Sequence, residues 1–411
     1  MTEDLPAEIV AVIEEIDAFI ATEIRPLEEE ADNARFFDHR REYARTDFEA
    51  GGVPSAEWEG LLEQMIDRAD RAGLWRYGLP EELGGRGASN FALAVIREHL
   101  NRLGIGLHND AQSEVSMIGN FPTVILAHEF GTPEQRETFV EGALRREASL
   151  AFGLTEPNHG SDATYMETVA RRDGEEWVID GVKRFNSGMH RASHDLVFAR
   201  TSGSPGEPLG ITAFIVPRDA PGLSVDFFWW TFNMPTDHAE VSLKGVRAGD
   251  SAILGELGGG LMLAQRFLHE NRIRQAASSL GAAAFCIEEA VKWARHRTVG
   301  GKPLWRNQGI QFPLAELWTD CELVRGLVRR TAAELDRHHH MEVTHLVAMA
   351  NYRANRLACE AADRAMQTCG GMGYTRHMPF EHIYRHHRRY RITEGTEEIQ
   401  LRKVGYELFK G

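Results

Sequence analysis

The chain has 411 residues, which is enough for two or three domains and a large core. Its 46 Lys and Arg residues against 61 Asp and Glu residues give a net charge of −15, which argues against nucleic acid or an anionic membrane as the main partner. The first residues show no basic-then-apolar signal and no apolar run approaches membrane-spanning length, so we expect a cytoplasmic protein that spans no membrane.

Apolar residues recur at helical spacing through the first third of the chain. The pattern over residues 9–24 predicts a helix that ends at Pro26, and the pattern over 58–72 predicts a second helix that Gly73 stops. Further helices are expected at 91–103, 111–130 and 133–145. Residues 1–150 are therefore predicted to form an N-terminal helical domain.

The pattern changes after residue 150. Between 166 and 253, short segments rich in Val, Ile, Phe and Thr are divided by turn signals such as Asp173-Gly174, which predicts a small antiparallel β-barrel or sheet domain over 151–254. Residues 255–411 are expected to form a C-terminal domain, a four-helix bundle built from 261–296, 309–337, 343–368 and 396–409. This order predicts an α+β fold without alternating βαβ units.

Cysteine and histidine patterns give no metal site. Four scattered cysteines, at 286, 321, 359 and 369, are predicted to be reduced core thiols rather than a disulfide or zinc framework. His382 and His386 have the i, i+4 spacing of metal ligands, but no third ligand accompanies them, so we predict a solvated polar face. The motifs for nicotinamide binding, for a P-loop and for a serine-hydrolase elbow are also missing from the sequence.

Two stretches have the residue types that chemistry needs. Glu394 precedes Gly395 and Thr396 at the start of an amphipathic run, where a carboxylate can lie at a tight turn and backbone N–H groups can face an anion. The same short pattern is also typical of an ordinary loop-to-helix junction. Residues 151–162 combine small side chains with hydroxyls, which lets the backbone approach a flat, hydrogen-bonding ligand closely.

These two stretches carry a resemblance to a known family. Thr155–Pro157 followed by Gly160–Asp162 resembles the signature of the acyl-CoA dehydrogenase family, and Glu394–Thr396 resembles that family's catalytic-base segment. Other matching pieces follow in the family's order and cover nearly the whole chain: Leu79–Gly85, Lys183–Ser187, Arg297–Lys302 with Gln308, and Gln367–Gly371.

The resemblance implies that FAD is held between the β domain and the C-terminal bundle, usually in a homotetramer, so we expect a homotetramer or homodimer. Phe185 and Ser187 would lie by the central flavin ring and N5. The full set of implied cofactor-binding residues is Phe152, Leu154, Thr155, Phe185, Ser187, Arg297, Gln308, Gln367, Gly370, Gly371, Thr396 and Glu398. Ser161, Arg272 and Gly395 would contact the acyl-CoA substrate, and an electron-transfer flavoprotein or a similar acceptor would take the electrons.

The resemblance also implies a mechanism. The Glu394 carboxylate would abstract the α-proton of an acyl-CoA thioester while hydride leaves the β-carbon for flavin N5, giving the trans-2-enoyl-CoA. The backbone N–H of Glu394 would donate to the thioester carbonyl, and burial should raise the pKa of the Glu394 carboxyl. Asn271 stands where some branches carry the base, which leaves Glu394, with Glu270 as a substitute.

Three departures and alternatives accompany this interpretation. Phe185 stands where the family commonly has Trp, so an aromatic face is kept and an indole donor is lost. The run Phe227–Phe232 is predicted to supply core to the β domain, or alternatively to line the substrate entrance. The alternative functions are an acyl-CoA oxidase or flavin monooxygenase on the same fold, and a non-catalytic CoA-binding scaffold.

Overall fold

The computed structural model describes residues 5–109 and 115–410, with only the backbone of Glu270, and the chain divides into two compact units. The first, called here the helical unit, comprises Met1–Arg45, Ser55–Asn120 and Asn271–Gly411. The second, called here the β unit, comprises Thr46–Pro54 and Phe121–Glu270. Each unit is described by itself.

The helical unit begins with a continuous helical segment. Helix α1 (Ala7–Phe19) runs through a π-helical turn, Ile20–Ile24, into α2 (Arg25–Glu29). The predicted helix end at Pro26 is therefore wrong. Pro26 lies directly after the π-helical turn, where the backbone hydrogen bonds change register, so the chain stays helical through the proline.

Serine caps define the next two helices, α3 (Ala56–Arg71) and α4 (Asn90–Arg102), and confirm both predictions. The Oγ atom of Ser55 accepts a hydrogen bond from the Trp58 N–H at 3.4 Å, and Ser89 caps α4 in the same way. The apolar face of α3 packs into a core with the N-terminal helices and α4, formed by residues such as Ile16, Trp58, Leu61, Met65 and Leu100.

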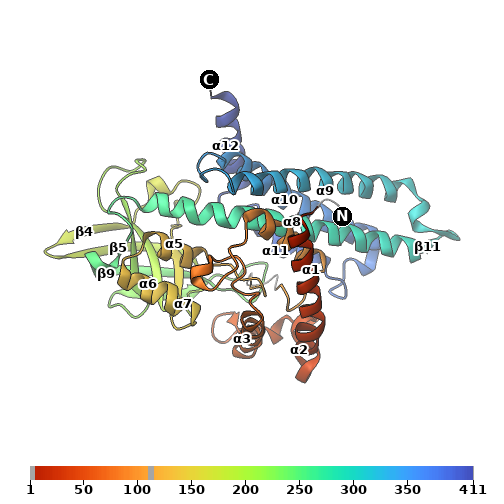
Figure 1. Cartoon of the computed structure of the whole chain (residues 1–411), viewed down its shortest axis with the longest axis horizontal. Coiled ribbons are helices and arrows are strands. Elements are labelled where there is room, and N and C mark those ends of the chain that lie inside the picture. Colours follow the sequence, from red (N-terminus) through yellow and green to blue (C-terminus); the bar gives the residue numbers. More distant parts are fainter. Residues whose placement is uncertain (1–4, 110–114, 411) are drawn as a thin grey trace. The chain divides into compact units, whose positions relative to one another are not determined.

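The long helices of the C-terminal part pack against one another in the helical unit (Figure 1). They are α8 (Gly260–His296), which begins in the β unit, α9 (Gln308–Leu335), α10 (Thr344–Cys369), α11 (Phe380–Arg389) and α12 (Glu397–Phe409). The four predicted helices are confirmed, and α11 joins them. The contacts are rich in alanine, including Ala276, Ala354 and Ala361, whose small side chains let helices approach closely.

The β unit holds eight strands of one sheet within the described residues. They are β3 (Leu150–Gly153), β4 (Val169–Asp173), β5 (Glu176–Ser187), β6 (His194–Arg200), β7 (Ile211–Pro217), β8 (Leu223–Phe228), β9 (His238–Gly249) and β10 (Ile253–Leu254). The order is β10-β7-β6-β4-β5-β9-β8, with β3 beside β6. Pairing is antiparallel except for β3 with β6 and the single β4–β6 pair.

Small helices and hairpins complete the two units. The predicted helix at 133–145 is confirmed as a run of α6 (Pro133–Arg136), a π-helical turn (Glu137–Glu141) and α7 (Gly142–Leu144). The helix predicted at 111–130 is wrong over 115–121, because α5 spans only Pro122–Phe130; residues 110–114 lie outside the described part. Two-residue strands pair as β1 (Thr46–Asp47) with β2 (Val53–Pro54), and β11 (Thr298–Val299) with β12 (Lys302–Pro303).

Burial confirms one side-chain prediction and corrects two. All four cysteines are buried and free, as predicted. His382 and His386 are each 3 % exposed, so the predicted solvated face is wrong. The predicted core role of the run Phe227–Phe232 is wrong at three of its positions, because the side chains of Phe227, Trp230 and Phe232 are 46 %, 62 % and 69 % exposed.

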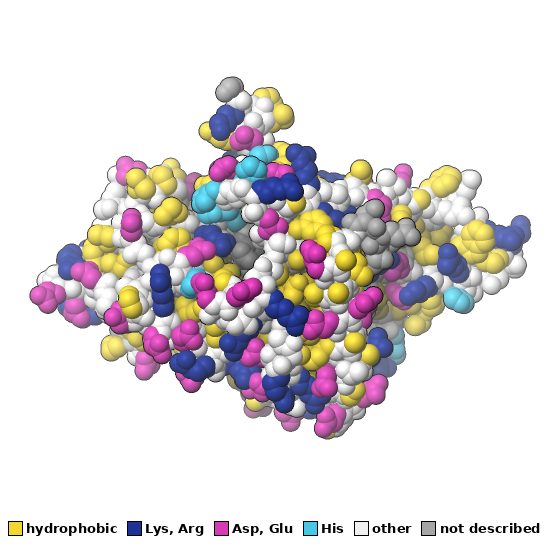
Figure 2. Space-filling view, in the orientation of Figure 1, with side chains coloured by type: hydrophobic (Ala, Val, Ile, Leu, Met, Phe, Trp, Pro, Cys, Tyr) yellow, Lys and Arg dark blue, Asp and Glu magenta, His cyan; other side chains and the backbone are white. Residues whose placement is uncertain are grey.

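The surface carries mixed charge and one apolar helix end. Acidic and basic side chains are interspersed over the face seen in Figure 2, so the net negative charge is distributed on that face. The last turn of α12 exposes Tyr406, Leu408 and Phe409, and the C-terminal end of this helix projects from the other helices of its unit (Figure 1). Within the described residues, none of the helices combines the length and the apolar character that a membrane crossing requires.

Candidate active site

The predicted base, Glu394, lies in a strained turn whose backbone is fixed by side chains. Glu394 and Gly395 have φ values of 59° and 91°, in the left-handed region that few non-glycine residues adopt. Arg272 donates from Nε and Nη2 to the Glu394 carbonyl oxygen at 2.8 and 2.6 Å. Gln400 Nε2 donates to the same oxygen at 3.1 Å. The main chain at the half-buried Glu394 is therefore held from two helices, α8 and α12.

Arg272 is itself fixed in the helical unit. Arg272 is only 2 % exposed. Its backbone carbonyl accepts a hydrogen bond from Asn351 Nδ2 at 3.0 Å. Burial lowers the pKa of Arg272 to about 10, and the negative charge of Glu394 acts in the opposite direction. Burial, followed by the charge of Arg272, lowers the pKa of Lys403 to about 8. Arg272 thus remains a cation at neutral pH beside the base.

The helix after the base begins with a cap and a buried carboxylate. Thr396 is the N-cap of α12 and its Oγ1 accepts the Ile399 N–H at 3.4 Å. Glu397, at 7 % exposure, accepts hydrogen bonds from Arg391 Nε at 2.9 Å and from Arg356 Nη2. Glu398, which the sequence predicts as a cofactor contact, is exposed. Hydrogen bonds from its own backbone N–H and from the Thr396 hydroxyl lower the pKa of Glu398.

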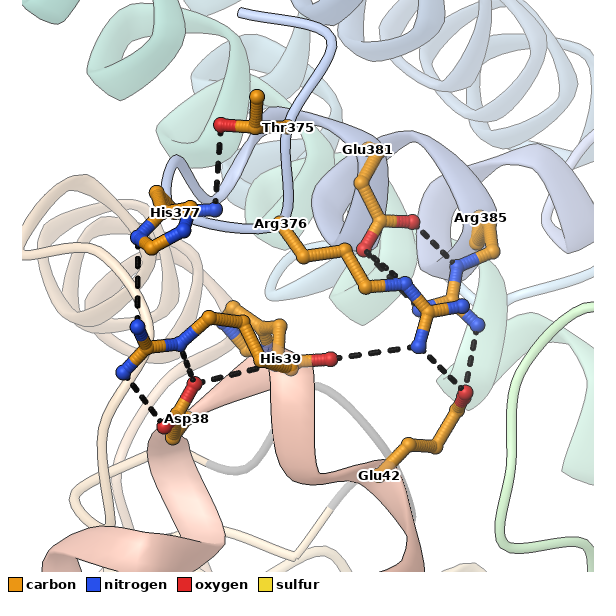
Figure 3. A network of polar contacts seen from close by, with 9 residues as sticks. Asp38, His39, Glu42, Thr375, Arg376, His377, Glu381 and Arg385 are labelled. Carbon is orange, nitrogen blue, oxygen red and sulfur yellow. Dashed lines mark hydrogen bonds and ion pairs between the residues drawn. The ribbon is translucent and has the colours of Figure 1, made fainter. Parts of the chain in front are cut away.

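Helix α11, which leads into the base turn, is tied to the N-terminal segment by ion pairs (Figure 3). Arg385 donates to Glu42 at 2.8 Å and to Glu381 at 2.7 Å, and Arg376 reaches Glu42 at 3.1 Å. The His39 and His382 rings stack with centroids 4.3 Å apart. The segment at 38–42 and the turn before α11 are therefore joined through one polar network.

The inner face of α11 carries a second set of hydrogen bonds. Ser279 Oγ lies 2.9 Å from His387 Nδ1 and donates to Asn355 Oδ1 at 2.7 Å, and Asn355 Nδ2 donates to the Tyr390 carbonyl at 2.9 Å. Burial lowers the pKa of His386 well below its ordinary value, so this imidazole is neutral at pH 7. Among the described residues no group of three or more His, Cys, Asp and Glu could hold a metal ion.

In the β unit, a β-bulge aims the predicted flavin residues outward. The β5–β9 register shifts between Arg184 and Asn186, and Phe185 at this shift has a φ of 63°. Lys183 and Asn186 are fully buried, whereas Phe185 and Ser187 are exposed. In a regular strand, Phe185 would point to the same inner face as Lys183, two residues before it. The bulge reverses this alternation, so the Phe185 ring and the Ser187 hydroxyl lie on the outer face.

The strip Phe152–Thr155 lies directly beside this bulge. The Thr155 carbonyl accepts the Arg184 N–H at 2.9 Å, and Lys183 Nζ donates to the Leu154 carbonyl at 3.3 Å. The same Nζ forms a buried ion pair with Glu156 Oε1 at 2.8 Å. Apolar ring faces and hydroxyl groups at this strip and bulge suit a flat ring system with polar edges, so the residues present fit a flavin.

A buried carboxyl supports the strip from below. Asn186 Nδ2 donates to Asp195 Oδ2 at 2.5 Å, and burial raises the pKa of Asp195 to about 7. A Cβ atom at Gly153 would lie 2.8 Å from Asn186 Nδ2 and 3.1 Å from the Asp195 carboxylate, so only glycine leaves room for this pair.

The structure groups some predicted site residues and leaves others apart. It brings Arg272, Glu394 and Gly395 into one cluster beside the Thr396 cap, and Phe152, Leu154 and Thr155 next to Phe185 and Ser187. Six other predicted residues are exposed: Ser161, Arg297, Gln308, Gln367, Gly370 and Gly371. Asp162 caps a 3-10 turn by accepting the Thr164 N–H at 3.0 Å.

The residues around Glu394 include the two positions considered for an alternative base and three positioning residues. Asn271 accepts a hydrogen bond from Asn120 Nδ2 at 3.3 Å, and the side chain of the substitute base Glu270 lies outside the described part. Gln400, Glu397 and Asn351 were missed as positioning residues. Glu397 and Gln400 follow the base closely in the chain, and this proximity was the available sequence signal for the two residues.

Comparison with known proteins identifies the family. Three family models match successive parts of the chain: the acyl-CoA dehydrogenase N-terminal domain at residues 6–147, the middle domain at 151–246 and the C-terminal domain at 258–409. Together the matches span most of the sequence in the family's own order.

Individual relatives agree with these models. A 3-(aryl)acrylate reductase of Clostridium sporogenes is 33 % identical over 356 residues, covering 85 % of this chain and 90 % of the relative. The mitochondrial short-chain specific acyl-CoA dehydrogenase of Bos taurus is 34 % identical over 348 residues, covering 84 % and 82 %. The structure of butyryl-CoA dehydrogenase from Megasphaera elsdenii is 26 % identical, covers 100 % of both chains and has a TM-score of 0.77. The chain belongs to the acyl-CoA dehydrogenase family, FAD-dependent oxidoreductases that act on acyl-CoA.

Proposed function

We propose that this protein desaturates an acyl-CoA thioester between the α and β carbons, giving the trans-2-enoyl-CoA, with Glu394 as the base. The observation that carries the proposal is the turn at Glu394. Its carbonyl oxygen receives three hydrogen bonds, two from Arg272 and one from Gln400, in a left-handed conformation that the chain would not adopt unaided. Such a fixed backbone is what a base needs to hold its carboxylate at one place.

The backbone of this turn also has a part in the reaction. The carbonyl of Glu394 accepts hydrogen bonds from Arg272 and Gln400, which fixes the peptide plane between Glu394 and Gly395. The N–H of Glu394 is proposed to donate to the thioester carbonyl oxygen as negative charge develops on it. Glu394 itself takes the α-proton at its carboxylate.

The proposed FAD contacts form two groups. The flavin ring would be held by Phe152, Leu154, Thr155, Phe185 and Ser187. The rest of the dinucleotide would be held, in a homotetramer or homodimer, by Arg297, Gln308, Gln367, Gly370, Gly371, Thr396 and Glu398. When bound, FAD supplies the acceptor for the β-hydride. Ser161 would contact the CoA portion of the substrate, and an electron-transfer flavoprotein or similar acceptor would receive the electrons.

The substrate class is tested with a panel of thioesters. The relatives are named for aryl acrylates and for short-chain acyl groups, so the panel should contain 3-arylpropanoyl-CoA and straight-chain acyl-CoAs from four carbons upward. Anaerobic mixing with the purified holoprotein is expected to bleach the flavin absorbance with at least one class. Absence of bleaching across the panel would contradict the proposal, and rapid oxygen consumption would favour an oxidase or monooxygenase.

The role of Glu394 is tested by Glu394→Gln. This variant is expected to retain FAD and to lose bleaching by about three orders of magnitude, because the amide cannot accept the α-proton. Glu407→Gln, on an exposed position of α12, is the matched control and should behave as the parent protein. Unchanged bleaching in Glu394→Gln would assign the base to another residue, with Glu270 the next to test.

A further inference from the structure

Ser187 and His238 form a hydrogen-bonded pair on the outer face of the β unit. The antiparallel β5–β9 register places the two residues directly opposite each other. Side chains at opposite positions share one face of a sheet, and Ser187 Oγ lies 2.8 Å from His238 Nδ1. The exposed end of β5 thus presents a serine hydroxyl that is backed by an imidazole.

The surrounding backbone fixes both partners. The His238 N–H donates to Thr236 Oγ1 at 3.3 Å, and its carbonyl accepts the Trp229 N–H at 2.8 Å. Ser187 Oγ also lies 3.2 Å from the Phe185 carbonyl at the bulge. The hydroxyl therefore has two acceptors within reach, and its proton can turn between them.

Asp237 contacts the same nitrogen of the ring. Its Oδ1 lies 3.2 Å from His238 Nδ1, with Asp237 and His238 side chains 23 % and 19 % exposed. In a nucleophilic Ser-His-Asp triad the serine and the acid contact opposite ring nitrogens, so this arrangement does not activate Ser187 as a nucleophile. It instead allows Nδ1 to alternate between accepting from Ser187 and, once protonated, donating to the Asp237 carboxylate.

We propose that Ser187 and His238 form a proton relay for flavin N5. The inference rests on the proposed function, in which Ser187 holds the flavin ring, and on the family resemblance, which implies that Ser187 lies beside N5. If FAD is bound as proposed, it would supply an N5–H whose proton has to leave when a one-electron acceptor such as an electron-transfer flavoprotein withdraws two electrons in succession. Ser187 Oγ takes this proton while its own proton passes to His238 Nδ1, and the carboxylate of Asp237 stabilises the resulting imidazolium.

A second group of charged side chains on this face is paired within itself. Arg184 donates to the Glu240 carboxylate at 2.8 and 3.0 Å, and Trp229 Nε1 donates to Glu240 at 3.0 Å. Arg184 also lies over the Trp229 ring at 4.7 Å. The carboxylate of Glu240 is therefore engaged by Arg184 and Trp229, whereas the carboxylate of Asp237 contacts the imidazole of His238.

The relay is tested on holoprotein that is reduced with dithionite, without acyl-CoA, and reoxidised by ferrocenium in a stopped-flow instrument. His238→Asn and Ser187→Ala are each expected to slow reoxidation about tenfold and to reduce its solvent deuterium isotope effect. His194→Asn is the matched control, because His194 Nδ1 also contacts a serine hydroxyl, that of Ser193 at 3.0 Å, in the same unit. Parent-like reoxidation in His238→Asn would overturn the relay.

A second readout does not depend on turnover. In protein with ¹⁵N-labelled histidine, reduction of bound FAD is expected to shift the His238 imidazole titration by at least about half a pH unit, and Ser187→Ala should abolish this shift. An unchanged titration in the parent protein would also overturn the relay. These results are separable from the proposed function. Acyl-CoA can bleach the flavin in a protein that shows no relay, and reoxidation can show the relay in a protein that no acyl-CoA bleaches. Failure to bind FAD would contradict both.

Discussion

Arg272 donates two hydrogen bonds to the carbonyl oxygen of Glu394, from Nε at 2.8 Å and from Nη2 at 2.6 Å. The sequence resemblance assigns Arg272 to the CoA portion of the substrate. In the structure its fork of donors is directed at the backbone of the base, the side chain is buried, and the backbone carbonyl of Arg272 accepts a hydrogen bond from Asn351. We therefore expect Arg272 to act mainly by positioning Glu394.

Substitution Arg272→Lys tests this role with the positive charge kept. A lysine ammonium cannot make the two parallel hydrogen bonds of the guanidinium fork, so kcat is expected to fall about 10- to 100-fold while KM for acyl-CoA changes less than about threefold. Steady-state kinetics with an artificial acceptor measure both constants. Arg353→Lys, whose side chain is paired with Asp320 at 3.9 Å on another helix face, is the control. A large rise in KM with kcat preserved would instead assign Arg272 to the CoA contact.

Gly395→Ala probes the strain in the same turn. Gly395 has a φ of 91°, and an added Cβ would lie 3.2 Å from Arg272 Nη2, so the variant is expected to lose about 1–2 kcal/mol of unfolding free energy and part of kcat. Urea unfolding followed by circular dichroism provides the first value. Gly405→Ala, in α12 with no atom within 4 Å of the added Cβ, is expected to be neutral or slightly stabilising. Equal effects at the two glycines would remove the strain argument.

Glu397→Gln tests the buried anchor of α12. Glu397 is held by Arg391 and Arg356, and loss of its charge leaves both guanidinium groups with a weaker acceptor, so stability should fall by about 1–3 kcal/mol. Glu407→Gln removes an exposed contact to Lys410 at 4.0 Å and is expected to cost less than about 0.5 kcal/mol. Thermal unfolding of the two variants measures the difference. Equal shifts in their unfolding midpoints would show that the buried ion pairs of Glu397 stabilise the protein no more than the exposed contact of Glu407.

The sequence predicted the helices and the family because their signals are local. Apolar periodicity and a serine cap determine α3, and a short motif marks Glu394, so neither requires knowledge of distant contacts. The same holds for the order of helical and β segments.

The contacts of the site depended on pairing across long stretches of chain. Arg272 and Glu394 are 122 positions apart, and the Ser187–His238 pair exists only because of the β5–β9 register. The outward turn of Phe185 likewise depends on a one-residue shift between strands, which alternation within β5 alone does not reveal. His382 and His386 were placed on a solvated face because polarity suggested it, whereas stacking on His39 and packing of α11 bury them.

Asp195 should make the stability of the protein depend on pH. Burial raises its pKa from 3.8 to about 7, so the folded chain binds a proton over this range that the unfolded chain releases. Stability is therefore lost as pH rises, and between pH 5.5 and 8 the parent protein is expected to lose about 2 kcal/mol relative to Asp195→Asn. Urea unfolding at the two pH values measures this difference. Asp250→Asn is the control: ion pairing with Arg172 lowers the pKa of Asp250, which stays ionised at both pH values, so its effect should not change with pH. A pH dependence that is the same in Asp195→Asn and the parent would show that Asp195 is not the responsible group.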